Sequence, residues 1–73
     1  MKKTIFDEGY KVFVRRLKKA REDAGLTQVQ VATKLKSTQA YVSKVESGQL
    51  RVDVAQLKRF AQMYRKSVNY FTK

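Results

Sequence analysis

Apolar residues recur at helical spacing in the first third of the chain. From position 10 onward they form one face of an α-helix, consisting of Tyr10, Phe13, Val14, Leu17, Ala20 and Ala24. Most residues between them are charged, which indicates that the opposite face meets solvent. Gly25 follows, and glycine readily takes the left-handed conformation that ends many helices. The pattern therefore predicts a first helix from Tyr10 to Ala24.

A complete helix-start signal comes directly after this glycine. Thr27 is a good N-cap residue, and Gln30 three positions later completes a capping box. Leu26 can pack against Val31 as a hydrophobic staple. The apolar face of the predicted helix consists of Val31, Ala32 and Leu35. A second helix is therefore expected to begin after Thr27.

A short turn separates this second helix from a third. Residues 36–37 form the turn, and Thr38 can cap the helix that follows. The third helix has one apolar pair, Val42 and Val45, so most of its other side chains should face outward. Gly48 can end it. The pattern predicts two short helices joined by a tight turn.

The same helix-start pattern occurs once more. Asp53 can cap a fourth helix, with Gln56 at the third helical position. Val52 can pack against Leu57 in the manner of a staple. The apolar face of this helix is predicted to consist of Val54, Leu57, Phe60, Ala61 and Tyr64.

The end of the chain adds one more short element. Residues 67–71 can form a last turn of helix, and no segment shows the two-residue alternation of a strand. The sequence thus predicts an all-α fold of five helices. Residues 1–73 should form a single domain, with residues 1–8 as an N-terminal arm.

The charge balance indicates a polyanionic partner. The chain has 17 Lys and Arg against 6 Asp and Glu, a formal net charge of +11 and a pI near 10.3. DNA, RNA and an anionic membrane surface all attract such a protein. No apolar run approaches the roughly 20 residues of a membrane span, and none follows the basic start as in a signal peptide. We therefore expect a cytoplasmic protein.

The chain contains no Cys and no His. Disulfides, thiolate nucleophiles and the usual zinc ligands are therefore excluded, and most general-base chemistry lacks its usual side chain. We expect neither an enzyme nor a bound metal or cofactor.

Residues 13–71 resemble the Cro/repressor-type, xenobiotic-response-element-like helix-turn-helix domain of bacterial and phage transcription regulators. The resemblance rests on Ala24-Gly25-Leu26-Thr27-Gln28, Val31-Ala32, Leu35, Thr38-Gln39, residues 42–48 and Ser67-Val68-Asn69-Tyr70-Phe71. It implies a compact, lambda-repressor-like five-helix bundle with a central helix-turn-helix. It also implies that helix 38–47 enters the major groove of double-stranded DNA. One departure is Lys36, which occupies a turn position that usually holds glycine in this family.

Four outward-facing residues of helix 38–47 are the candidate base contacts: Gln39, Ala40, Tyr41 and Lys44. Gln39 can bond to adenine through two hydrogen bonds, and Lys44 can donate to guanine acceptors or to a phosphate. Ala40 can touch a thymine methyl group. Tyr41 is bulky where the family often has a small polar residue, so stacking, a sugar-phosphate contact and a base contact all remain open for it.

The resemblance also assigns backbone contacts and one structural pair. Gln28 and Thr38 lie at helix N-termini and are expected near DNA phosphates. Arg51, in the loop after the third helix, is a further candidate phosphate contact. Arg21 and Glu46 match positions that form an ion pair in the family.

The apolar surface near the C-terminus indicates self-association. The candidate dimer-interface residues are Tyr64, Val68, Tyr70 and Phe71. We therefore expect a homodimer that binds an inverted-repeat operator as a sequence-specific transcriptional regulator, acting as a repressor.

Two alternatives remain open at this stage. The chain could be an antitoxin that holds a toxin protein and represses their shared operon, as many domains similar to this one do. It could also bind RNA or an anionic membrane by charge alone, although capping boxes and a helix-turn-helix are not needed for that. The apolar pair Ile5 and Phe6 in the arm could cover the core or a partner.

Overall fold

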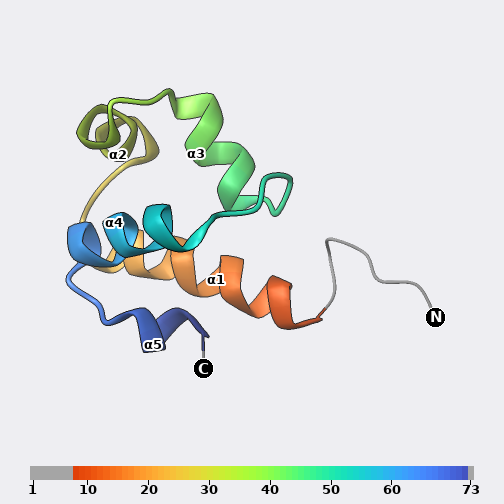
Figure 1. Ribbon diagram of the computed structural model, residues 1–73. Helices are drawn as coiled ribbons and strands as arrows, with labels where there is room; N and C mark the ends of the chain where they lie inside the picture. The colour runs from red at the N-terminus through yellow and green to blue at the C-terminus, as the bar shows by residue number, and fades with distance from the viewer. Residues whose placement is uncertain (1–7, 73) are drawn as a thin grey trace.

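The computed structural model describes residues 8–72, which form five α-helices (Figure 1). The helices are α1 (Glu8–Asp23), α2 (Gln28–Leu35), α3 (Gln39–Glu46), α4 (Val54–Tyr64) and α5 (Val68–Thr72). Within residues 8–72 there is no strand, so the predicted all-α fold with five helices is confirmed. Residues 1–7, which include Ile5 and Phe6 of the expected arm, lie outside the described residues.

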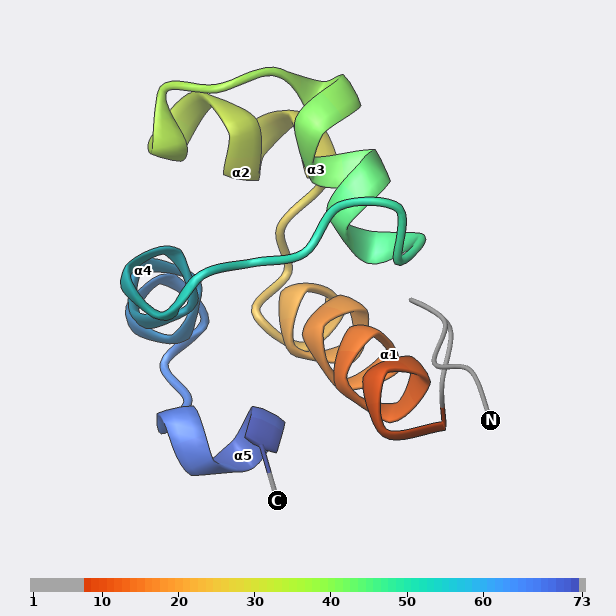
Figure 2. The same cartoon turned by 45° about the vertical axis from the view of Figure 1, so that its right-hand side comes forward.

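The helices are arranged around α1. Helices α2 and α3 pack against each other at one end of the molecule, and α3 also contacts α1 (Figures 1 and 2). Helix α4 packs on α1, and α5 packs on both at the end opposite α2 and α3. The helix-turn-helix therefore projects from a base made of the other three helices.

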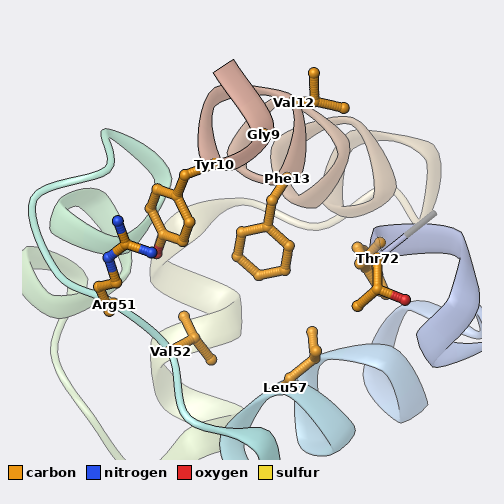
Figure 3. Close-up of a pocket in the computed structure, with 9 residues that line it drawn as sticks. Gly9, Tyr10, Val12, Phe13, Arg51, Val52, Leu57 and Thr72 are labelled. Atoms are coloured by element: carbon orange, nitrogen blue, oxygen red, sulfur yellow. The ribbon is translucent and has the colours of Figure 1, made fainter. Parts of the chain in front are cut away.

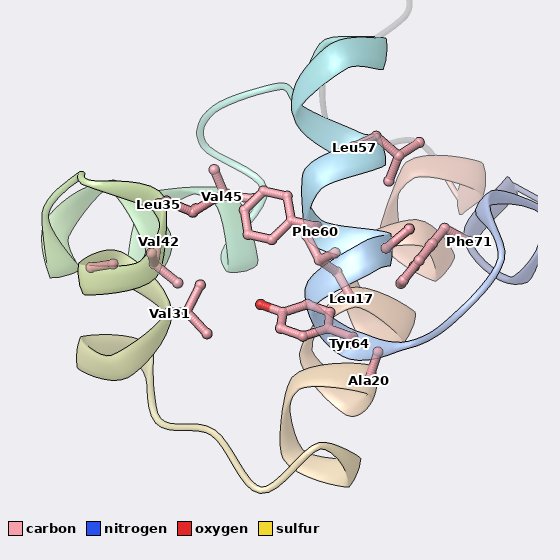
Figure 4. Packing of buried hydrophobic residues seen from close by; sticks show 12 residues of the cluster. Leu17, Ala20, Val31, Leu35, Val42, Val45, Leu57, Phe60, Tyr64 and Phe71 are labelled. Carbon is pink, nitrogen blue, oxygen red and sulfur yellow. The ribbon is translucent and has the colours of Figure 1, made fainter.

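The hydrophobic core lies between these helices (Figure 4). Its fully buried side chains with the largest volumes are Phe60, Phe71, Leu17, Val31, Val42 and Val45. Full burial of one such side chain stabilises the fold by roughly 1.5–3 kcal/mol. Since Val42 and Val45 supply the only buried positions of α3, they fix how this short helix sits on the base.

The helix starts agree closely with the sequence pattern. The capping box predicted at Thr27 is present with both of its hydrogen bonds, so this prediction is confirmed. Thr38 caps α3 and Asp53 caps α4, as predicted. Helix α1 begins at Glu8, two residues before the apolar pattern does, because a carboxylate in the first turn interacts favourably with the helix dipole.

Two positions in α4 differ from the prediction. Val54 is 67% exposed, because it is the first helical residue after the Asp53 cap and points away from the core. The Gln56 side chain does not complete a capping box; it reaches a side chain of α3 instead. The cap at Asp53 is therefore a single hydrogen bond, from the Gln56 backbone to the aspartate.

Two of the candidate dimer-interface residues belong to the core of the protomer itself. Tyr64 is 3% exposed and Phe71 is 2% exposed, because α4 and α5 both turn these side chains toward α1. They are not available to a partner, and this part of the interface prediction is wrong. Val68 and Tyr70 are only partly buried against the core and keep some surface.

Candidate nucleic-acid interface

The turn between α2 and α3 closes in the left-handed conformation. Lys36 has φ 58° and ψ 45°, and its backbone N–H donates to the carbonyl oxygens of Ala32 and Thr33. The Ser37 N–H donates to the Ala32 oxygen at 2.8 Å. A non-glycine residue in this conformation costs roughly 1–2 kcal/mol. The turn thus keeps the geometry that glycine would allow, although a lysine occupies the position.

Helix α3 presents a polar face opposite its buried one. Val42 and Val45 are inaccessible to solvent, whereas Gln39, Ala40 and Lys44 are exposed. Three of the four candidate base contacts are therefore free to meet another molecule. Tyr41, the fourth, is half-buried on the flank of the helix.

An ion pair joins the first helix to the end of α3. Arg21 Nε donates to Glu46 Oε2 at 2.7 Å and its Nη2 donates to Oε1 at 3.1 Å, while the side chains are only 10% and 4% exposed. Arg21 Nη1 also donates to the carbonyl oxygen of Leu26 at 2.8 Å. These hydrogen bonds raise the pKa of the Arg21 guanidinium above its usual value. The structure thus brings the expected pair together, where it ties α1, α3 and the start of α2 to one another.

This buried carboxylate also holds a polar chain that reaches the surface. Gln28 Nε2 donates to Glu46 Oε1 at 3.0 Å, and Gln39 Nε2 donates to Gln28 Oε1 at 2.9 Å. A carboxylate only accepts hydrogen bonds, so the Gln28 amide must turn its nitrogen toward Glu46. The Gln28 oxygen then faces Gln39, so Gln39 must donate to it through its own amide nitrogen. The orientation of the Gln39 amide is therefore set by a charge in the interior of the protein.

The oriented Gln39 amide keeps two free groups. Its Oε1 and the second N–H of its Nε2 are not used by the bond to Gln28. One acceptor next to one donor is the complement of the major-groove edge of adenine, where N7 accepts and the N6 amino group donates. The arrangement is suited to reading an adenine.

The phosphate candidates lie at or near this face. Thr38 Oγ1 accepts the Tyr41 N–H at 3.1 Å, which leaves the hydroxyl proton of Thr38 free to donate. Gln28 Nε2 similarly retains one N–H beside its bond to Glu46. Both donors stand at helix N-termini, where backbone N–H groups already favour an anion.

Arg51 is exposed in the loop between α3 and α4 and lies over an aromatic ring of α1. Its guanidinium carbon is 4.1 Å from the centre of the Tyr10 ring, and the Tyr10 hydroxyl donates to the Leu50 oxygen at 3.2 Å. Burial raises the pKa of Tyr10. The sequence indicated Tyr10 only as part of an apolar face, because no local pattern links residues 41 positions apart. Tyr10 therefore supports both Arg51 and the loop that carries it.

A hollow of about 500 Å³ lies beside this stacked pair (Figure 3). It is lined mainly by apolar side chains of α1, α4, α5 and the α3–α4 loop, including Phe13, Val52, Leu57 and Phe71. Arg51 and Tyr10 stand together at one side of it, and Thr72 at the other. Of the predicted DNA-contact residues, only Arg51 borders this hollow.

Tyr41 has a partner that sequence reasoning missed. Its hydroxyl accepts a hydrogen bond of 3.1 Å from Nε2 of Gln56, in the first turn of α4. The sequence indicated Gln56 as a capping-box residue, whose side chain would bond to the backbone at the start of its own helix instead of to Tyr41. No signal in the sequence distinguishes the two, since the choice depends on how α3 packs beside the start of α4.

Residues 8–72 offer little for other kinds of site. Among them no group of three or more Asp, Glu, His or Cys side chains is placed to hold a metal ion. In the same range no helix is both long enough and apolar enough to cross a membrane. The net charge of +11, together with exposed cationic side chains such as Lys44 and Arg51, matches a negatively charged partner.

Comparison with known families gives one match. The model of a family described as a helix-turn-helix domain matches residues 12–68, more than half of the chain. This range contains α2, the turn and α3, together with the residues of the polar chain from Arg21 to Gln39. No curated protein and no solved structure matches the chain.

Proposed function

Because the chain belongs to a helix-turn-helix domain family and is a DNA-binding regulator, we propose that it recognises its DNA sequence-specifically, as a repressor. In this proposal α3 is the recognition helix and lies in the major groove, which is wide enough for one α-helix. A repressor of this kind acts by occupying an operator. It works in the cytoplasm, where it meets the DNA.

One observation carries the proposal. The Gln39 side chain is exposed at the N-terminal end of α3, and its amide orientation is set through Gln28 by the buried Glu46. A side chain that is free to rotate before binding loses conformational entropy when it binds, whereas one that is already held in place loses less. A preoriented amide with one free donor and one free acceptor supports direct reading of adenine.

The neighbouring side chains extend this reading surface. Ala40 offers a methyl group for contact with thymine, and Lys44 offers an ammonium group for the N7 and O6 acceptors of guanine. Both are exposed on the same helix as Gln39. In the proposal these three residues read base edges, while Val42 and Val45 hold the helix behind them.

Contacts to the DNA backbone fix the register of the recognition helix. Thr38 and Gln28 each retain a free donor at a helix N-terminus, and Arg51 extends a cation from the following loop. Such contacts position the protein but carry no sequence information. They are proposed to contribute equally to specific and nonspecific binding.

We further propose a homodimer on an inverted-repeat operator. Two recognition helices related by a two-fold axis would enter successive major grooves about 34 Å apart. The partly exposed Val68 and Tyr70 of α5 supply apolar surface for such a pairing. Sedimentation equilibrium with and without operator DNA tests it; a mass of one chain on each half-site, with no coupling between half-sites, contradicts it.

The proposal is tested by selecting bound sites from a random duplex pool with purified protein. We expect an inverted repeat with an adenine at the position that Gln39 reads. Gln39→Ala should then weaken the selected site by about 1–3 kcal/mol and relax that single position. Gln62→Ala removes the same amide from an exposed position on α4 and should leave the selected site unchanged. Equal binding of selected and random DNA by the parent protein refutes the proposal.

A further inference from the structure

We propose that the Tyr41 hydroxyl is a hydrogen-bond donor to the bound DNA duplex and that Gln56 and Arg59 of α4 are the positioning residues that give it this polarity. The inference rests on the proposed function, because it takes α3 as the helix that meets DNA. It adds two residues outside the helix-turn-helix to the recognition apparatus. It also states which chemical groups the phenol can and cannot accept as partners.

The direction of the Gln56–Tyr41 hydrogen bond follows from the positive charge of Arg59, which bonds to the other end of the Gln56 amide. Arg59 Nη1 donates to Gln56 Oε1 at 3.4 Å, and a guanidinium has donors only. The Gln56 amide must therefore turn its oxygen toward Arg59 and its nitrogen toward Tyr41. If the amide were reversed, its N–H groups would face the guanidinium, donor against donor. The contact of 3.1 Å to Tyr41 is consequently one in which the phenol oxygen accepts.

The position of Gln56 is restrained at both ends. Its backbone N–H donates to the Asp53 cap at 2.8 Å, which holds it in the first turn of α4. Arg59 is one helical turn further along and reaches the Leu35 carbonyl oxygen at the end of α2 at 3.5 Å. This contact ties the Arg59 guanidinium, which ends the series of hydrogen bonds from Tyr41, to the helix-turn-helix itself. The Tyr41–Gln56–Arg59 chain therefore joins α2, α3 and α4.

The consequence for Tyr41 is a single free donor. A phenol that accepts from Gln56 directs its own O–H proton elsewhere, and it is left with a proton to give. Oxygens of a phosphate, O6 and N7 of guanine, N7 of adenine and O4 of thymine can accept it, whereas the amino groups of adenine and cytosine cannot. Tyr41 thus differs from Gln39, which keeps one donor and one acceptor.

The two chains of contacts lie on opposite flanks of α3. On the α2 flank, a buried carboxylate orients Gln39 through Gln28; on the α4 flank, a guanidinium orients Tyr41 through Gln56. Tyr41 is half-buried and packs against the core, so its ring has little freedom and its hydroxyl lies where α3 meets α4. A donor whose oxygen is held in a fixed position is suited to one acceptor on the duplex.

The first test is Tyr41→Phe, which keeps the ring in its place and removes only the hydroxyl. We expect affinity for the selected duplex to fall about tenfold, as for the loss of one hydrogen bond to a strong acceptor. The temperature of unfolding should stay close to that of the parent, since the ring still packs against the core. Unchanged affinity with unchanged folding overturns the inference.

The second test separates positioning from contact. Gln56→Glu puts a carboxylate beside the phenol; it accepts the Tyr41 proton, pairs with Arg59 and so removes the free donor. We expect a loss of affinity similar to that of Tyr41→Phe after correction for the added negative charge. Gln62→Glu supplies that correction, because it places the same charge on the exposed surface of the same helix.

A double-mutant cycle completes the second test. In the Tyr41→Phe background, Gln56→Glu should lower affinity only by the charge effect, because no proton remains to be withdrawn. If Gln56→Glu has the same effect with and without the phenol, the two residues act independently. That result overturns the positioning role.

Modified duplexes identify the acceptor. If it is a phosphate, one methylphosphonate substitution should reduce parent binding and abolish the effect of Tyr41→Phe, with equal losses on selected and random DNA. If it is a base, 7-deazapurine or a changed base at one operator position should do so, with losses on selected DNA alone. A Tyr41→Phe effect that no modification removes overturns direct contact.

These results also separate this inference from the proposed function. When Gln39→Ala relaxes one operator position and Tyr41→Phe changes nothing, the proposed function stands and the inference fails. When the parent shows no preference for any duplex sequence, sequence-specific regulation fails. In that case a loss of affinity of Tyr41→Phe for random DNA would still support a phosphate contact of Tyr41. Unchanged affinity of Tyr41→Phe for random DNA would overturn the inference.

Discussion

Nε2 of Gln39 lies 2.9 Å from Oε1 of Gln28, so the first helical residue of α3 is hydrogen-bonded to the first helical residue of α2. Gln28 is in turn bonded to Glu46, which pairs with Arg21. An exposed side chain on α3, the proposed recognition helix, is thereby connected to the interior of the fold. The connection predicts that residues that make no contact with a base influence sequence specificity.

Gln28→Ala should reduce specificity at the same operator position as Gln39→Ala. Without Gln28 the Gln39 amide can rotate, so binding must order it again, and we expect a loss of about 1–2 kcal/mol on the selected site. The proposed phosphate contact of Gln28 is lost as well, which weakens selected and random DNA alike. Affinities of the two single variants and of the double variant provide the measurement. The double variant should lose less than the sum of the single losses, and full additivity would show that the hydrogen bond has no role in binding.

Glu46→Ala should strongly destabilise the protein. It leaves the Arg21 guanidinium buried without its carboxylate, and removing one partner of such a pair typically costs about 3–5 kcal/mol. Urea unfolding monitored by circular dichroism measures the change. Asp23→Ala is the matched control, because its ion pairs with Lys19 and Lys66 are largely exposed and should contribute less than about 1 kcal/mol. An unchanged midpoint for Glu46→Ala refutes the structural role of the pair.

Arg51→Ala should weaken binding to all duplexes alike. The guanidinium is exposed beside the Tyr10 ring and is proposed to contact a phosphate, so its loss removes one released counterion. Plots of log affinity against log salt concentration should become less steep by about one, while the ratio of specific to nonspecific binding stays the same. Arg15→Ala removes the same charge from an exposed position on α1. If both variants give equal slopes, the contact is not made by Arg51.

Lys36→Gly should stabilise the protein. The residue holds φ 58°, which is unfavourable for a lysine and readily adopted by glycine, so the gain should be about 0.5–1 kcal/mol. Lys34→Gly removes the same charge from the last turn of α2 and should instead destabilise by about 1 kcal/mol. Chemical denaturation of both variants checks the prediction. A destabilised Lys36→Gly variant would mean that the lysine side chain stabilises the turn.

Tyr64→Phe should stabilise the protein by about 1 kcal/mol at neutral pH. Within residues 8–72 the Tyr64 hydroxyl is the buried side-chain group that lacks a hydrogen-bond partner, and removing it ends a desolvation penalty. The ring remains and continues to pack beside Phe60. A destabilised variant, measured by urea unfolding, would show that the hydroxyl is satisfied in solution.

The same substitution should change the response to alkaline pH. Burial raises the pKa of Tyr64 well above its ordinary value of 10.0, so the folded state holds this proton more firmly than the unfolded state. Below pH 10 the hydroxyl is protonated in both states, whereas above pH 10 the unfolded state loses the proton first, so the stability of the parent falls as the pH rises further. The advantage of Tyr64→Phe over the parent should therefore widen above about pH 10. Unfolding curves collected across this range test it, and a constant difference contradicts it.

The local pattern of the sequence was sufficient for the five helices and for the starts of α2, α3 and α4. Thr27, Thr38 and Asp53 lie at the N-caps predicted for them, because capping depends on side chains within three or four residues. The apolar pair of α3, Val42 and Val45, was predicted for the same reason, since helical periodicity decides which side chains share a face. Val54 was assigned to the wrong side because a residue next to a cap can satisfy the period without reaching the core.

The partners of the polar side chains were decided only by the tertiary structure. The Gln56 side chain bonds to Tyr41 and not to the start of its own helix, Arg51 lies on Tyr10, and Tyr64 is enclosed by the fold. Each of these outcomes depends on the distance between helices that are far apart in the chain. The sequence alone determined which segments become helical, because that preference is local. Packing of those helices determined which donors and acceptors meet, and hence which remain free for DNA.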